Sequence, residues 1–434
     1  MKITINQKNY KFLSDNSKEC NNETAFFCCA QNEVYLKDAQ DNHAATIVTP
    51  KVLEEILNTQ DIMIVGLTGT NGKTTTAAAI YSILLDLDEK VAFQGTRGFY
   101  VNEDKLGSKG LTTPLLLETM HNMFLAKESG CTYFIMEVSS HAIEQNRIEN
   151  LKFHLKVYTN LTQDHLDYHG TFENYKKIKE SFFQDDCMKL INKDAKSIEF
   201  NMKKAYTYAL DAPASFNIIA YSLNDGITAI MKHFEKQVDF HTPLYGFFNL
   251  YNITAAIASV KLLTKHTLED ICVAVDNFAG VSGRMEVVSD RPLVIVDFAH
   301  TPDGMQQVMD SLKEKEIVVV FGAGGDRDKK KRPMMGRVAN RYAKKIYLTT
   351  DNPRSEDPMD IISDIYQAID QKEKVKVASI REDAIFFAID ELEEGETLLV
   401  LGKGDEEYQE VKGEKIPFDD REVVRAIIKE KFNR

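Results

Sequence analysis

Several features that mark whole classes of protein are missing from this chain of 434 residues. It has no run of eighteen apolar residues, which excludes a membrane-spanning helix. The N-terminal segment lacks the apolar stretch and the small-residue cleavage site of a signal peptide. The 6 cysteines form no CxxC pair and show no metal-ligand spacing, so we expect them to be reduced. These absences predict a cytoplasmic protein.

Basic residues are also in short supply, because 53 lysines and arginines face 66 aspartates and glutamates. The net charge of -13 would repel nucleic acid and anionic membrane surfaces at long range, so we expect neither as a partner. A local basic pocket for one anionic ligand stays open. The apolar fraction of 43% is that of a globular protein, and the length predicts two to three domains.

Strand-like and helical stretches alternate along most of the chain, which predicts an α/β fold. Short strands with polar connections occupy the first part. A series of buried strands and helices follows, as in a parallel sheet, with an antiparallel patch from about residue 189 to 240. A second such series forms another α/β unit with its own sheet. We therefore predict three domains, at 1–60, 61–283 and 284–434.

A glycine-rich segment, GLTGTNGKTTT at Gly66–Thr76, lies between a predicted strand and a predicted helix. Backbone N–H groups of such a loop, with the helix N-terminus, bind phosphates. Lys73 would place its charge on the transferred phosphate, and Thr74 would offer its hydroxyl to Mg²⁺. Leu67 replaces the first glycine of the strict phosphate-loop pattern, and a glycine-rich turn with a solvated lysine is the alternative. The motif predicts nucleotide binding, which kinases, GTPases and ligases share. The predicted contacts are Gly69, Thr70, Asn71, Gly72, Lys73, Thr74 and Thr75.

Acidic and histidine side chains follow two further predicted strands. Glu137 ends the first strand, in EVSSH. The second strand is followed by Asp164, His165, Asp167 and His169. In an open parallel sheet, ligands bind at the carboxyl ends of the strands. A lone Glu or His there is more often a structural hydrogen-bonding group, but the phosphate loop favours a metal site. A threonine hydroxyl plus one carboxylate is a normal minimal ligand set for Mg²⁺.

Ten segments, taken together, resemble the Mur ligases. They occur in that family's order over nearly the whole chain: GTNGKTT, TTP, EVSSHAIEQNRI, NLTQDHLDYHG, GFFNLYN, GRMEVV, VDFAHTP, GDRDKKKRP, DNPR and GKGDE. The resemblance implies an ATP-dependent ligase that forms amide bonds. It also implies three α/β domains: a small UDP-binding domain, shortened here, a central ATPase domain with a parallel sheet, and a Rossmann-like domain for the amino acid.

The resemblance assigns further residues to ATP and magnesium. A lysine corresponding to Lys179 is carbamylated in the family, and its anionic oxygens help to position a second Mg²⁺. Without the resemblance, Lys179 would be read as a solvated helix lysine. Asn249 and Asn252 would contact the ATP base region, and helix N-capping is their alternative role. Arg284, Asp297 and His300 complete the implied ATP contacts. The implied catalytic set is Lys73, Glu137, His165, Lys179 and Arg284, with Thr74, Glu137, His165 and Lys179 as metal ligands.

Two more groups of residues are implied for the other substrates. A UDP-muramoyl dipeptide, the acceptor, would contact Ser17, Thr112, Thr113, Ser139, Gln145 and Arg147. The amino acid would be meso-diaminopimelate, in contact with Arg327, Asp351, Asn352, Pro353, Arg354, Gly402 and Glu406. Arg354 can form a two-pronged pair with its distal carboxylate, and Glu406 can accept from its distal ammonium.

Other functions stay open on the residues. A lysine-adding or folyl-glutamate-adding ligase would share the ATP machinery, and DNPR could be only an Asx-Pro turn. Lysine lacks the distal carboxylate, a mismatch of about 2–5 kcal/mol at a desolvated arginine. A P-loop kinase or GTPase-like switch would hydrolyse nucleotide without any amino acid, and a cell-wall scaffold would need no activity. We expect a monomer that uses ATP, Mg²⁺ and small-molecule substrates.

Overall fold

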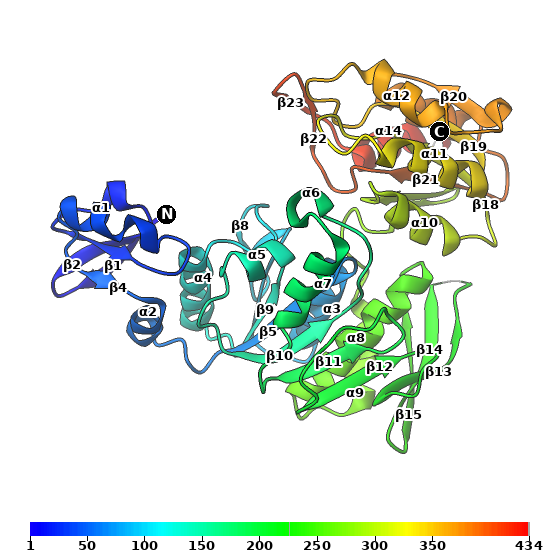
Figure 1. Cartoon of the computed structure of the whole chain (residues 1–434). Helices are drawn as coiled ribbons and strands as arrows, with labels where there is room; N and C mark the ends of the chain where they lie inside the picture. Colours follow the sequence, from blue (N-terminus) through cyan, green and yellow to red (C-terminus); the bar gives the residue numbers. More distant parts are fainter. Residues whose placement is uncertain (225, 433–434) are drawn as a thin grey trace. The chain divides into compact units, whose positions relative to one another are not determined.

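The computed structural model describes residues 1–224 and 226–432 (Figure 1). These residues divide into two compact units. Within these residues, the first unit holds a 4-stranded and an 11-stranded sheet, and the second holds a 6-stranded sheet and a 2-stranded ribbon. The predicted α/β architecture is confirmed, whereas the three domain boundaries stay predictions. Over the described part of the chain, no helix is long and apolar enough to cross a membrane. The first unit comprises Met1–Tyr221, Thr228–Thr242 and Tyr251–Phe278, and the second comprises Ser222–Ile227, Pro243–Leu250 and Ala279–Arg434.

The N-terminal sheet is small and has mixed strand directions. Its order is β1 (Lys2–Gln7), β2 (Tyr10–Ser14), β3 (Thr24–Phe27) and β4 (Ile47–Val48), and only β1 and β2 are antiparallel. Leu53 and Leu57 of α2 (Pro50–Leu57) pack in one cluster with Leu116 and Met120 of α4 (Leu116–Glu128). This shared core joins the small sheet to the central part of the same unit. The short α1 spans Leu36–Asp41.

The central sheet of the first unit is mostly parallel. Its order is β15-β14-β13-β12-β11-β10-β5-β9-β6-β7-β8, with β7 and β8 antiparallel at one edge. The strands are β5 (Met63–Thr68), β6 (Val91–Gly95), β7 (Gly98–Val101), β8 (Asp104–Gly107), β9 (Tyr133–Glu137), β10 (Phe153–Tyr158), β11 (Met188–Asn192), β12 (Ala205–Ala209), β13 (Phe216–Ser222), β14 (Ile227–His233) and β15 (Lys236–Thr242). The helices are α3 (Lys73–Asp86), α5 (Ser140–Glu144), α6 (Leu166–His169), α7 (Phe172–Ser181), α8 (Phe247–Leu263) and α9 (Leu268–Ala274).

The strand order brings three segments of the first unit together. β5 pairs in parallel with both β9 and β10, so the carboxyl ends of these three strands are adjacent. α3 packs on β5, β6 and β9. Tyr175 of α7 and Phe183 share a buried cluster with Phe134 of β9 and Tyr158 of β10. The glycine-rich loop, the end of β9 and the segment after β10 therefore meet where open parallel sheets bind ligands.

The segment after residue 187 departs from the prediction. β11 pairs in parallel with β10, β12 with β11, and β13 with β12. The antiparallel patch predicted for about residues 189 to 240 is therefore wrong for these three pairings. The connection between β11 and β12, residues 193–204, is long enough for the crossover that parallel strands need. A pattern of short alternating segments does not reveal such a crossover.

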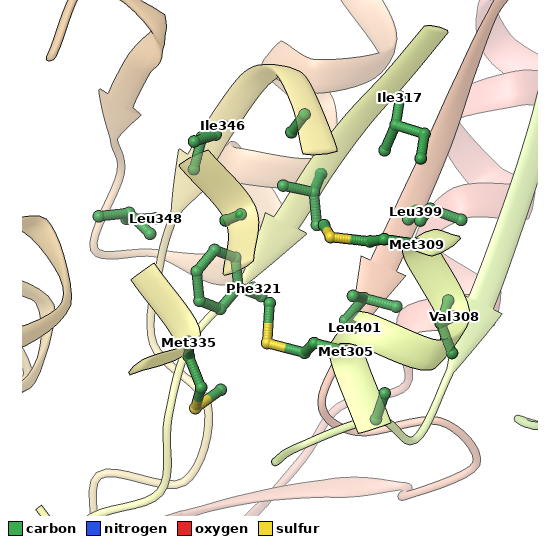
Figure 2. Close-up of a cluster of buried hydrophobic side chains, with 14 of the residues drawn as sticks. Met305, Val308, Met309, Ile317, Phe321, Met335, Ile346, Leu348, Leu399 and Leu401 are labelled. Carbon is green, nitrogen blue, oxygen red and sulfur yellow. The ribbon is translucent and has the colours of Figure 1, made fainter. Parts of the chain in front are cut away.

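The second unit is built around a sheet with apolar residues on both faces. Its order is β16-β17-β21-β18-β19-β20, antiparallel only between β16 and β17. Phe321 of β18 and Leu401 of β21 pack against Met305 and Met309 of α10 (Figure 2). Alternate residues of the same strands form a second cluster with α13 and α14. The elements are β16 (Glu286–Asp290), β17 (Leu293–Asp297), α10 (Pro302–Asp310), β18 (Glu316–Phe321), α11 (Lys331–Tyr342), β19 (Ala343–Leu348), α12 (Pro358–Tyr366), β20 (Val375–Val377), α13 (Arg381–Asp390), β21 (Glu396–Leu401), β22 (Tyr408–Val411), β23 (Glu414–Pro417) and α14 (Asp420–Phe432).

A buried arginine fixes the glycine-rich segment that follows β18. Arg332, at the start of α11, is 1% exposed and binds both carboxylate oxygens of Glu356, at 2.8 and 3.0 Å. Glu356 also accepts from the backbone N–H of Asp326 at 2.7 Å. The Arg332 guanidinium lowers the pKa of Glu356 to about 2.

This ion pair should make the free energy of unfolding depend on pH. The pKa of Glu356 is lower in the folded protein than its ordinary value of 4.5, so the stabilisation is complete above pH 4.5 and is lost as pH falls towards 2. Glu356→Gln should therefore reduce the free energy of unfolding by about 2–3 kcal/mol at neutral pH and by progressively less in acid. Urea unfolding between pH 3 and 7 measures this, with exposed Glu414→Gln as the control. A difference that stays constant with pH would contradict the assignment.

Candidate active site

The glycine-rich loop is shaped by close contact with α8. Gly72 has φ 84°, and a Cβ there would lie 2.3 Å from Oδ1 of Asn252. The hydroxyl of Thr76 donates to the same oxygen at 3.3 Å. Asn249 donates through Nδ2 to the carbonyl of Tyr245 at 2.8 Å. α8 begins at Phe247, so both asparagines lie inside the helix and the N-capping alternative is wrong.

Two lysines converge on one carbonyl oxygen of this loop. Nζ of Lys73 donates to the carbonyls of Gly69 and Thr70, at 2.8 and 2.9 Å, and Nζ of Lys179 donates to the same Gly69 oxygen at 2.8 Å. Lys179 is 1% exposed, so the alternative of a solvated helix lysine is wrong. Burial, reinforced by the charge of Lys73, lowers the pKa of Lys179 well below its usual range. A neutral amine of this kind is the nucleophile that reaction with carbon dioxide requires.

A buried carboxylate connects the loop to the end of β9. Glu137 is 1% exposed, and it accepts from the Thr74 hydroxyl at 2.8 Å and from the Thr96 N–H at 2.9 Å. Hydroxyl and carboxylate oxygens are the ligands that Mg²⁺ prefers. No group of three or more His, Cys, Asp or Glu in the described residues could hold a metal.

His165 lies immediately before α6 in a left-handed conformation, with φ 51°. Its Nε2 is 3.4 Å from Oδ2 of Asp164, and its ring lies edge-on to His141 with centroids 5.0 Å apart. Burial lowers the pKa of His165; Asp164 opposes this shift, while Lys73 and Lys179 add to it. The imidazole is therefore favoured in its neutral form, which is the form that binds metals.

Five of the predicted acceptor residues form one network at the end of β9, and four of them are directly connected. The Thr113 hydroxyl donates to the carbonyl of Glu137 at 2.9 Å and accepts from the Ser139 N–H at 3.0 Å. Arg147 donates to the Thr113 carbonyl and to Oε1 of Gln145, at 2.9 Å each. The fifth residue, Thr112, joins through the Thr96 hydroxyl at 3.1 Å. The glycine-rich loop and the network of predicted acceptor residues therefore share Glu137.

A cavity of about 510 Å³ lies next to this network and reaches Pro114, the neighbour of Thr113. Its polar lining includes Gln94, Glu118, His121 and Asn122. Ser17 lies elsewhere, in the N-terminal part, where it is buried and its carbonyl accepts from Asn42 at 3.1 Å. Among the described residues, no hydrogen bond joins Ser17 to the other predicted acceptor contacts, and its role stays a prediction.

The second unit gathers three predicted ATP contacts around the end of β17. Asp297 is buried and accepts from two backbone N–H groups at 2.7 Å each. Burial raises the pKa of Asp297, and the charge of Arg284 opposes this shift. The guanidinium of Arg284 lies 4.3 Å from the ring centroid of Phe298. His300 follows in the same segment, with Nδ1 2.9 Å from the Phe298 carbonyl. Their contact with ATP stays a prediction.

The segments after β19 and β21 approach closely in the second unit. A Cβ on Gly402 would lie 2.4 Å from Oδ2 of Asp351. Asn352 donates to Glu406 at 2.9 Å, and Lys403 donates to Glu406 at 2.9 Å and to Asn352 at 3.2 Å. Lys403 is fully buried. No sequence pattern singled out Lys403, although the GKGDE segment contains it.

Arg354 lies beside the glycine-rich segment after β18. Its Nη1 donates to the carbonyl of Gly325 at 2.7 Å, and its Nε donates to Glu410 at 3.0 Å. A Cβ on Gly325 would lie 1.9 Å from the carbonyl oxygen of Pro353, so the two segments are in contact. Arg327 follows Gly325 closely and is exposed. DNPR is therefore in contact with the segment after β18 and with β22, and is not an isolated turn.

Comparison with known proteins defines the family. Residues 67–260 match the model of the Mur ligase middle domain, and residues 283–404 match that of the Mur ligase, glutamate ligase domain. A curated relative from Wolinella succinogenes is 51% identical over 99% of both chains. The chain belongs to the Mur ligase family.

The relatives share one name. The Wolinella protein and a Helicobacter pylori protein, 48% identical over 98% of this chain and 97% of the relative, are each named UDP-N-acetylmuramoyl-L-alanyl-D-glutamate–2,6-diaminopimelate ligase. A solved structure with that name has a TM-score of 0.71 at 29% identity and covers 96% of this chain and 94% of its own. A Mycobacterium tuberculosis folylpolyglutamate synthase complexed with ADP shares the fold, with a TM-score of 0.65 at 16% identity over 81% of this chain and 91% of its own.

Gly72→Ala should selectively impair nucleotide binding. Alanine in a left-handed conformation costs about 1–2 kcal/mol wherever it occurs, but at Gly72 the new Cβ also meets a side chain of the site. Gly395→Ala is the matched control, because Gly395 has φ 89° and a Cβ added there would meet no atom within 4 Å. Titration with a fluorescent ATP analogue should show about tenfold weaker binding for Gly72→Ala and unchanged binding for the control. Equal affinities would contradict the role of this loop.

Proposed function

We propose that this chain is the ligase that adds meso-diaminopimelate to UDP-N-acetylmuramoyl-L-alanyl-D-glutamate in peptidoglycan synthesis, converting ATP to ADP and phosphate. The observation that carries the proposal is that Asn352 donates to Glu406, while Arg354, two residues further on, donates through its guanidinium to the Gly325 carbonyl. The opposite charges of Arg354 and Glu406 match those of the distal end of diaminopimelate. The relatives with this name cover the whole chain and support the same reaction.

The chemistry requires that a carboxylate be made reactive. The γ-phosphoryl group passes from ATP to the side-chain carboxylate of the D-glutamyl residue, which gives ADP and an acyl phosphate. The amine of diaminopimelate, after losing a proton, attacks the acyl carbon, and phosphate leaves as the amide forms. Lys73 extends to the transferred phosphoryl group, where its charge stabilises the oxygens of the transition state. To do so it must exchange its contacts with Gly69 and Thr70 for the phosphate.

Magnesium fits the buried pair of Thr74 and Glu137. Their oxygens already lie 2.8 Å apart, and the Glu137 carboxylate has no cation paired with it among the described residues. Bound Mg²⁺ would neutralise charge on the phosphate oxygens. Lys179, as a carbamate, would add anionic oxygens next to Gly69, and His165 would add a neutral ring nitrogen. We assign these four residues to the metal on that basis.

Arg354 and Glu406 can distinguish diaminopimelate from lysine. Arg354 presents N–H donors to the distal carboxylate, and Glu406 presents an oxygen to the distal ammonium. Lysine would bring its ammonium without the carboxylate, which leaves Arg354 without its partner. Since ATP and a nucleotide sugar are cytoplasmic metabolites, we place the reaction in the cytoplasm. We also expect the chain to act as a monomer.

Purified protein with ATP, Mg²⁺ and the acceptor should release phosphate with diaminopimelate and far less with lysine. The expected preference in kcat/KM is at least about 30-fold, which corresponds to the lower end of the cost of an unpaired arginine. Arg354→Ala should remove most of this preference. Equal turnover of lysine would contradict the specificity, and phosphate release without any amino acid would indicate a nucleotide switch.

Lys179 should carry a carbamate in the active protein. Incubation with ¹³C-bicarbonate should give a carbamate signal in the ¹³C NMR spectrum that is absent from Lys179→Arg. Ligase activity should fall at least about tenfold in that variant, because the anionic oxygens are lost. Lys177→Arg, an exposed position on the same helix, is the control and should keep both signal and activity. A signal that persists in Lys179→Arg would refute the assignment.

A further inference from the structure

A carboxylate outside the predicted substrate contacts lies against the guanidinium of Arg354. Glu410, in β22, accepts from Nε of Arg354 at 3.0 Å. The two residues are also joined through the backbone, because the Arg354 N–H donates to the Glu410 carbonyl at 3.0 Å. The Lys412 N–H donates in turn to the Arg354 carbonyl at 2.7 Å. The β22–β23 ribbon therefore holds both the main chain and the side chain of Arg354.

The contact with Glu410 uses only one side of the guanidinium. Nε is bound by Glu410, and Nη1 donates to the carbonyl of Gly325 at 2.7 Å. A guanidinium has five N–H donors, so Nη1 and Nη2 retain hydrogens for an incoming carboxylate. Such a carboxylate would form the bidentate interaction, with two parallel N–H···O bonds, that arginine favours. Glu410 and a substrate carboxylate can therefore bind Arg354 at the same time.

Orientation of Arg354 is costly without such support. An arginine side chain has many rotamers and loses conformational entropy when it is fixed in one of them. Its backbone has φ 50°, a conformation that L residues adopt with strain. The side chains of Arg354 and Glu410 are 21% and 32% exposed, so their pairing is partly shielded from water. These features favour a contact that fixes the arginine before the substrate binds.

We propose that Glu410 is a positioning residue, which holds Arg354 ready to bind the distal carboxylate of the amino-acid substrate. The inference rests on the proposed function, since it assumes that Arg354 binds this carboxylate. A carboxylate that merely competed with the substrate would have the opposite effect, because its removal would then improve binding. The direction of the change in KM separates the two roles.

Steady-state kinetics of the full-length protein test the proposal. Glu410→Ala should raise KM for diaminopimelate about tenfold, with kcat and the KM values for ATP and the acceptor within about twofold of the unmodified protein. In Glu410→Gln, KM for diaminopimelate should stay within about threefold of the value for the unmodified protein, because the amide oxygen of glutamine still accepts from Nε of Arg354. Glu410→Asp keeps the charge but shortens the side chain, so it should also raise KM for diaminopimelate. This variant replaces Glu410→Ala in the test if the alanine variant does not fold. Glu414→Gln, on the other strand of the ribbon, is the control, and it should leave kcat and all three KM values unchanged.

Two results for Glu410→Ala would overturn the proposal. An unchanged or lower KM for diaminopimelate in Glu410→Ala excludes a positioning role. A similar rise in the KM for ATP or the acceptor indicates a general structural defect. If the unmodified protein uses diaminopimelate but Glu410→Ala does not alter its KM, only this inference fails. If the unmodified protein does not use diaminopimelate at all, the proposed function fails together with it.

Discussion

The carboxylate of Glu137 lies where three parallel strands end, and residue 137 takes part in two networks. Its side chain accepts from the hydroxyl of Thr74 at the start of α3, and its main-chain carbonyl accepts from Thr113. Because Glu137 is buried, movement of either network would leave a polar group without its partner. The geometry of the glycine-rich loop is thereby tied to that of the predicted acceptor residues. A γ-phosphoryl transfer to a carboxylate needs this kind of fixed relation between donor and acceptor.

Each unit also buries a lysine beside residues assigned to a substrate, and the two lysines differ in their partners. Lys403 is paired with the carboxylate of Glu406, so its charge is compensated. Lys179 donates to the carbonyl of Gly69 and the hydroxyl of Thr68, both neutral groups, and Lys73 shares the first of them. An ammonium is costly in such a place. The cost favours the neutral amine, in keeping with the lowered pKa of Lys179. This is the form that reacts with carbon dioxide, so we keep the carbamate assignment.

The positions of the glycine-rich loop after β5 and of Glu137 at the end of β9 could be predicted from the sequence, because each follows an apolar run that is typical of a buried parallel strand. Their roles stay predictions. Other features depend on contacts that no local pattern contains. Glu410 is 56 residues from Arg354 and belongs to no recognised segment. The burial of Lys179 could not be seen in a helix that also carries exposed Lys177. The crossover between β11 and β12 was also missed, because the direction in which two strands pair is not contained in the sequence pattern of either strand.

A crystal structure with Mg²⁺ and a non-hydrolysable ATP analogue would test the central role of Glu137 most directly. We expect the metal to lie about 2.1 Å from the Thr74 hydroxyl oxygen and from a Glu137 carboxylate oxygen, or to reach the latter through one water. The hydrogen bond between these two residues would then be replaced by the metal. A magnesium ion held on the phosphates, with Glu137 linked to it neither directly nor through water, would contradict the account.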